Sequence, residues 1–300
     1  MITQGWWQYT QMFRRQQAVL KRTDLLRLFN HALAQMPGIK NLIFSHLGGS
    51  RGSVTENGGT DSSRPYCLAP AIEENMSSPP HLVDFFEAWN QAGKPLNIFN
   101  CVAASVYLPA IGKPLTPTSL NIFRNTRRMA IVYGSELIDW VRAMREKEAH
   151  IIRQGYTGQL LAAATSVENL CISGAVNVFF TTLPVTLYPI LGNMSWAHLT
   201  ILSLSTVEIT FHELETLCDN QMNTLEVLLI LRAGLFGGTW ASALPVIRRL
   251  RKLREVVLTG LWHGKNVHKL IVNENSKQAV QKYVLEGGPN PLEPAPPPSA

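Results

Sequence analysis

The stretch LREVVLTGLW, residues 253–262, contains the pattern that decides the fold of this chain. Its residues Leu253, Val256 and Leu258 follow the spacing LxxLxL, where x is any residue. The same spacing recurs in four earlier phrases, at Ile39-Leu42-Phe44, Val167-Leu170-Ile172, Leu199-Leu202-Leu204 and Leu225-Leu228-Ile230. The last four copies are separated by steps of 32, 26 and 28 residues. A period of this length is typical of proteins built from stacked repeats.

Short helical patterns fill the intervals between these phrases. Leu214 and Leu217 lie three residues apart in one interval, and Leu244, Ile247 and Leu250 repeat this step in the next. A strand followed by a helix in every unit predicts parallel strands with right-handed crossovers. No single unit can bury its own apolar face, so the units must stack. We therefore expect an α/β leucine-rich-repeat solenoid, with parallel strands on the concave face, helices on the convex face and an N-terminal capping helix.

The composition along the chain predicts four segments. Gly, Ser and Thr dominate the second segment, which has almost nothing to bury, and prolines prevent regular hydrogen bonding in the last one. Degenerate copies of the repeated phrase occur near residues 95 and 127. The segments are 1–47, an N-terminal helix over 9–36 and a first strand; 48–80, a flexible insertion; 81–285, an irregular leucine-rich-repeat domain; and 286–300, a disordered tail.

The overall composition favours a folded protein inside the cell. Of its 300 residues, 46% are hydrophobic and only 16% are charged, which suits a large core. The formal net charge of +6 permits contact with an acidic partner without requiring one. The N-terminus lacks the pattern of a secretory signal, and the longest apolar run, 175–192, falls short of the roughly 20 residues of a membrane span. We expect a cytoplasmic or nuclear location, no secretion and no membrane partner.

Motifs for catalysis or metal binding are incomplete. In HELET, residues 212–216, Thr216 stands where a zinc site of the HExxH type needs a second His. His263 and His268 have no Cys or carboxylate nearby in the sequence to complete a ligand set. We therefore predict no catalytic residues, no metal and no cofactor. An enzyme whose site is assembled from scattered residues stays an alternative.

A cluster of basic residues offers a second alternative. It consists of Arg248, Arg249, Arg251, Lys252 and Arg254. Such a cluster could bind nucleic acid or another acidic partner. However, the neighbouring apolar residues mark the inner side of a predicted helix, which would leave the arginines on its solvated outer side. The aromatic residues that stack on bases are also lacking, so nucleic acid is the less favoured partner.

Residues 191–262 carry a more specific resemblance. Three phrases stand in succession: LTILSLSTVEITFHELETL, then TLEVLLIL, then GTWASALPVIRRLRKLREVVLTGLW. This arrangement resembles the leucine-rich-repeat region of fungal F-box proteins. The resemblance implies that the repeats bind a substrate protein, while a separate F-box docks onto a ubiquitin-ligase scaffold and other subunits transfer ubiquitin.

The chain departs from that family in two respects. Nothing before residue 40 shows the opening Leu-Pro and the succession of short helices of an F-box. The Asn or Cys that commonly follows LxxLxL is replaced by Ala175, Val207, Ala233 and Leu261. Contact with ligase scaffold subunits would thus depend on an F-box upstream of Met1.

The candidate binding residues follow from the alternation of side chains along a strand. If Leu228 and Ile230 face the core, the residues between and beside them face outward. The same argument applies to the strands on either side. The predicted partner-binding set is Ile201, Ser203, Ser205, Val227, Leu229, Leu231, Glu255, Val257 and Thr259. We expect a protein partner to pack on the aliphatic members, with Glu255 and the serines setting specificity at the rim. Coverage of these residues by a loop or by the tail stays open.

Overall fold

The computed structural model describes residues 22–45, 81–102, 117–133, 149, 152–174, 186–192, 195–264, 270–272 and 274–293. The strands are β1 (Asn41–Ser45), β2 (Ile98–Val102), β3 (Arg128–Val132), β4 (Asn169–Ser173), β5 (Ile201–Thr210), β6 (Val227–Phe236), β7 (Glu255–Thr259), β8 (Leu261–His263) and β9 (Leu270–Val272). The helices are α2 (Arg22–Gln35), α3 (His81–Gln91), α5 (Pro117–Leu120), η2 (Asn121–Phe123), α7 (Tyr156–Ala163), α8 (Leu187–Leu191), α9 (Phe211–Asn220), α10 (Trp240–Ile247) and α11 (Glu274–Glu286).

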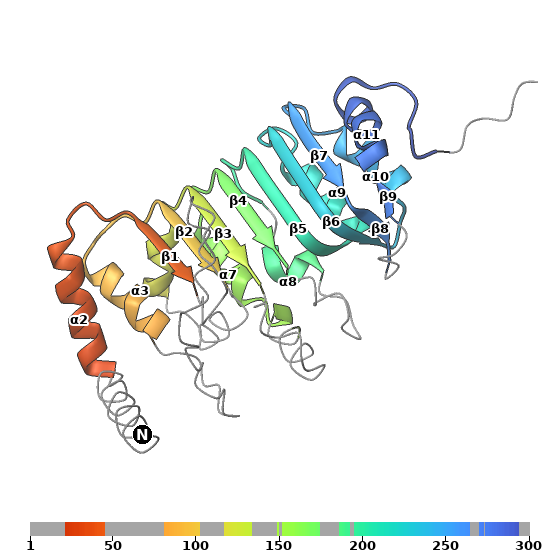
Figure 1. The fold of residues 1–300 in the computed structure, drawn as a ribbon. Helices are drawn as coiled ribbons and strands as arrows, with labels where there is room; N and C mark the ends of the chain where they lie inside the picture. The colour runs from red at the N-terminus through yellow and green to blue at the C-terminus, as the bar shows by residue number, and fades with distance from the viewer. Residues whose placement is uncertain are drawn as a thin grey trace, which may run out of the picture.

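The strands form one sheet whose spatial order follows the chain order from β1 to β6 (Figure 1). All neighbouring pairs from β1 to β7 are parallel. The long strand β6 pairs with β7 along its first half and with β8 along its second half. The last strand of the sheet, β9, pairs antiparallel to β8. The prediction of an α/β chain with a parallel sheet is confirmed. Assignment to the leucine-rich-repeat type stays a prediction.

Each predicted phrase forms a strand at the expected place. The two degenerate copies, near residues 95 and 127, form β2 and β3 and pair in register with the neighbouring strands. The last two apolar residues of each phrase lie two positions apart and both face the core, because successive side chains of a strand point to opposite faces of the sheet. Thus Leu202 and Leu204 are fully buried, while Ile201 and Ser203 are partly exposed.

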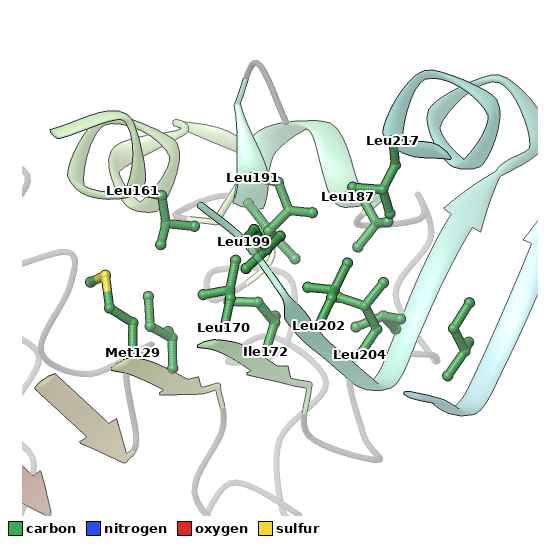
Figure 2. Packing of buried hydrophobic residues seen from close by; sticks show 14 of the residues in the cluster. Met129, Leu161, Leu170, Ile172, Leu187, Leu191, Leu199, Leu202, Leu204 and Leu217 are labelled. Carbon is green, nitrogen blue, oxygen red and sulfur yellow. The ribbon is translucent and has the colours of Figure 1, made fainter. Parts of the chain in front are cut away.

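The core lies between the sheet and the helices that follow the strands. In Figure 2, leucines of α7, α8 and α9 face apolar side chains of β4 and β5. The labelled residues that meet in this layer are Leu161, Leu187, Leu191, Leu217, Leu170, Ile172, Leu202 and Leu204. Toward β1 the core becomes aromatic, because Phe86, Phe99 and Phe123 pack edge to face with centroids 5.1–5.8 Å apart. A single continuous core therefore joins all units, which makes each unit dependent on its neighbours.

A column of left-handed residues interrupts β5 and β6, and the spacing of the LxxLxL phrases does not predict it. Thr206 has φ 55° and Arg232 has φ 54°, at equivalent positions of the two strands, and Gly260, which follows β7, has φ 65°. The alternation changes phase at this column. Leu204 is in the core before it, and Val207 and Ile209 are in the core after it. The left-handed residue thus switches the set of residues that faces the core. This backbone conformation costs about 1–2 kcal/mol when the residue is not glycine.

The structure corrects two expectations about helix and chain ends. Helix α10 ends at Ile247, so the basic cluster lies in the turns after the helix and not on its outer side. The tail was expected to be disordered from residue 286, but its first part packs on the fold. Asn290 Nδ2 donates to the carbonyl of Ala241 at 2.8 Å, and Leu292 packs against the core. Asn and Leu side chains offer contacts that the proline content alone does not reveal.

Several expectations lie outside the described residues. The insertion 48–80, the start of the helix predicted over 9–36, most of the apolar run 175–192 and residues 294–300 are among them. The end of that apolar run is described, and it forms the short helix α8.

Candidate functional site

The side of the sheet opposite the helices, here called the outer face, carries the predicted binding residues. Strand pairing places them in three rows across β5, β6 and β7. The rows are Ile201, Val227 and Glu255; then Ser203, Leu229 and Val257; then Ser205, Leu231 and Thr259. All nine therefore lie on one continuous area of three adjacent strands, about 4.8 Å apart from strand to strand.

The nine residues differ in the fraction of their surface that is exposed to solvent. Glu255 is exposed, and seven of the others are partly exposed. Val227 is only 9% exposed, since it lies between two neighbouring strands in the first row. It therefore offers a partner much less surface than its position in the sequence suggests. The residues Leu229, Leu231 and Val257 are partly exposed and adjacent, and they are here called the apolar patch.

The surroundings of the apolar patch are small and nearly uncharged. Ser203 and Ser205 lie beside it on β5, and Cys171 and Ser173 continue the same rows on β4. Among the described outward side chains of β1 to β7, the charged ones in these rows are Arg128 and Glu255. A large partner residue could reach the apolar patch without removing many charges from water, which keeps the desolvation cost low.

Ion pairs line the edge at which the strands begin. Arg127 lies 3.6 Å from Glu168, ahead of β3 and β4, and Arg254 lies 3.0 Å from Glu226, ahead of β7 and β6. The arginine side chains are 66% and 72% exposed, so each pair contributes little to stability. They form a polar rim on one side of the outer face.

Three of the five residues in the basic cluster are engaged within the protein. Arg249 contacts the carboxylates of Glu215 and Asp219 at 3.3 and 3.2 Å. Arg254 pairs with Glu226, and the guanidinium of Arg248 lies 5.0 Å from the ring centroid of Tyr283. A nucleic acid would have to compete with these contacts, and this weakens the case for the cluster as a phosphate-binding site.

Two residues of the incomplete motifs, Glu213 and His263, act at helix ends. Glu213 forms a capping box with Thr210 at the start of α9, whereas His212 is exposed. His263 Nε2 accepts the backbone N–H of Trp240 at 2.9 Å and so caps the first turn of α10. Within the described residues, no three His, Cys, Asp or Glu side chains are grouped so that they could hold a metal ion. His268 lies outside the described residues.

The cysteines of the described segments fall into two classes. Cys101 and Cys218 are buried, and burial raises the pKa of each thiol to about 12. Cys171 is partly exposed on the outer face. Burial keeps the first two thiols protonated and poorly reactive, so Cys171 is the accessible thiol of the outer face.

Comparisons with protein-family models, with curated proteins and with solved structures found no match. In the segments that the structure covers, every helix is too short or too polar to cross a bilayer.

Sequence reasoning missed one feature beside this site, the exposed Arg232 in the left-handed column. A signal for it is present in the repeat itself, because Gly260 stands at the equivalent position of the next unit. A glycine at one copy of a repeated position indicates a backbone conformation that the other copies share.

Proposed function

We propose that this protein is a leucine-rich-repeat solenoid that binds a protein partner on the outer face of its sheet and performs no catalysis itself. The apolar patch of Leu229, Leu231 and Val257 carries the proposal, because three aliphatic side chains lie side by side with few charges around them. Burial of such a patch in a complex is the usual source of affinity at a protein interface.

The resemblance to fungal F-box proteins supports a more definite role. In that role the outer face would recognise a protein destined for ubiquitin transfer, and other subunits would carry out the transfer. The strand–helix units from β5 to β8 correspond to residues 191–262, the part of the chain that carries the resemblance. Ligase membership further requires an F-box that docks onto the scaffold.

A pair of variants tests the binding face. Leu229→Glu places a carboxylate at the centre of the apolar patch, and Gln278→Glu places one on an exposed position of α11 as a matched control. Tagged wild-type and variant chains are purified from the native cells, and the co-purifying proteins are quantified by mass spectrometry. Each candidate partner is then titrated with the recombinant chain. We expect the partner to bind Leu229→Glu at least tenfold more weakly, and Gln278→Glu normally.

Three outcomes would change the proposal. A partner that binds Leu229→Glu and the wild type equally would place binding elsewhere. Collapse of the Leu229→Glu fold, seen by circular dichroism, would mean that the side chain is part of the core. Recovery of specific partners without any ubiquitin-ligase subunit would leave a free-standing recognition protein and remove ubiquitin from its function.

A further inference from the structure

Arg232 lies beside the apolar patch in a conformation that its own side chain makes unfavourable. It follows Leu231 at the end of the last row, with φ 54°, a value that L-residues other than glycine rarely adopt. The next unit has glycine at the equivalent position, Gly260, where the same conformation carries no steric cost. An arginine therefore stands where glycine would be more stable.

The surroundings of Arg232 do not account for this choice by internal contacts. Among the described residues, Arg232 forms no ion pair and no hydrogen bond through its guanidinium, and the residue is exposed. Strict alternation from Leu228 and Ile230 would point it into the core, but the left-handed backbone turns it out to solvent. The conformation thus presents a free cation at the border of the apolar patch.

Gly260 makes room for the stem of this arginine. A Cβ atom at Gly260 would lie 3.3 Å from Cγ and 3.4 Å from the backbone N and Cα of Arg232. Such distances are tighter than most real contacts, so a larger residue at 260 would push the arginine stem away. The first part of the Arg232 side chain therefore lies over Gly260, the residue after Thr259, which pairs with Leu231 of the apolar patch.

We propose that Arg232 binds a carboxylate of the protein partner, so that the outer face selects segments with an acidic residue close to a large apolar one. This inference rests on the proposed function, since the apolar residue would pack on Leu229, Leu231 and Val257. An exposed guanidinium recognises a carboxylate by two parallel hydrogen bonds. Leu229 and Arg232 are three residues apart, roughly 10 Å along the strand. An extended segment along β6 would thus place its Asp or Glu two to four residues from its apolar anchor.

The net charge of the protein agrees with this partner class. At +6, the chain attracts acidic segments at long range and repels basic ones. Within the described part of the chain, three of the five cations of the basic cluster contact a partner, whereas Arg232 contacts none. Recognition of a single carboxylate beside an apolar anchor requires one cation, which agrees with the small number of charged side chains on the outer face.

The test uses the full chain and a displayed library of random 12-residue peptides, compared among four proteins. For the wild type we expect enrichment of Asp or Glu two to four residues from a Leu, Ile, Phe or Met. Arg232→Gln should keep the apolar preference, lose the acidic one and bind the selected peptides about tenfold more weakly. Arg251→Gln, which removes an exposed cation from the turn after α10, should behave as the wild type. Leu229→Glu should bind none of the peptides.

The outcomes separate this inference from the proposed function. If no peptide is enriched, or if Leu229→Glu binds as well as the wild type, the binding face itself is wrong. If Leu229→Glu fails to bind but Arg232→Gln keeps both affinity and acidic preference, only the role of Arg232 is wrong. A phosphopeptide or a single-stranded oligonucleotide that binds more tightly than the carboxylate peptides, and depends on Arg232, would overturn the choice of a carboxylate. A wild-type dimer in sedimentation that Arg232→Gln abolishes would make a second copy the occupant and overturn it as well.

A second variant distinguishes binding from structure. Arg232→Gly keeps the left-handed backbone without its steric cost and removes the cation. We expect the variant to unfold at a Tm equal to or above that of the wild type, while its affinity for the selected peptides falls as in Arg232→Gln. A lowered Tm would show that Arg232 serves the fold, and would contradict the proposal.

Discussion

The carboxylate of Glu213 accepts the backbone N–H of Tyr188 at 2.7 Å and thereby links two successive helices, α9 and α8. The other oxygen of the same carboxylate accepts the backbone N–H and the hydroxyl of Thr210, at 2.8 and 2.9 Å. Thr186, the residue before α8, supplies no side-chain cap of its own. Glu213 therefore supplies a hydrogen-bond acceptor at the start of both helices, and these three bonds offset its burial.

Replacement of Glu213 by alanine should destabilise the protein measurably. The substitution leaves the N–H groups of Tyr188 and Thr210 without this acceptor, and we expect a loss of about 2 kcal/mol. For a chain of this size that corresponds to a Tm lower by roughly 4–8 °C in differential scanning calorimetry. Glu215→Ala, which removes a partly exposed ion pair from the same helix, should change Tm by at most about 1 °C. Equal effects of the two substitutions would contradict the bridging role.

Gly174, after β4, should tolerate no side chain. A Cβ atom there would clash with the carbonyl oxygen of Thr206, a backbone atom that cannot move aside without shifting β5. We expect Gly174→Ala to cost several kcal/mol or to prevent folding. Gly38→Ala is the matched control, because a Cβ atom at Gly38 meets nothing within 4 Å. Circular dichroism and urea unfolding of both variants check the prediction, and a Gly174→Ala protein as stable as wild type would refute it.

Stability should fall when the pH rises above about 9. In the folded chain the pKa of Cys101 and that of Cys218 are raised to about 12 by burial, from an ordinary value of 9.0, and burial also raises the pKa of Tyr133. Between pH 9 and 12 the unfolded chain releases protons that the folded chain retains, so unfolding becomes more favourable. Urea midpoints measured at pH 7.5, 9 and 10.5 should decrease across the series. The double variant Cys101→Ala and Cys218→Ala should show a shallower decrease, and an unchanged slope would count against this cause.

Thiol labelling should distinguish the outer face from the core. In a Cys67→Ser background we expect a maleimide to modify Cys171 rapidly at pH 7.5, since it is partly exposed on the outer face. Cys101 and Cys218 should react only after urea is added, because both are buried. Peptide mapping by mass spectrometry identifies the modified positions. A fluorescent label at Cys171, two strands from the apolar patch on β6, would then report partner binding. Rapid labelling of Cys101 would be incompatible with the described core.

The sequence by itself determined the parallel strands β1 to β7, their order and most of the residues that face outward, whereas it did not predict β8, β9 or the burial of Val227. Within each phrase, the spacing of Leu228 and Ile230 specifies a strand with one buried side, and its repetition every 26–32 residues specifies stacking. These properties depend on local alternation and on a period, both of which are visible in a single chain. The three rows across β5, β6 and β7 follow from them directly.

Only the tertiary structure decided the features that depend on residues far apart in the chain. Glu213 meets Tyr188, 25 residues earlier, and Asn290 meets Ala241, 49 residues earlier, and neither pair has a local signature. The change of phase at Thr206 and Arg232 is decided in the same way, because Val207 and Ala233 must reach the core that their neighbours have already shaped. The pattern of the sequence fixes which face of a strand is buried. Packing between units fixes where that pattern is interrupted, and the interruption brings Arg232 out to solvent beside the apolar patch.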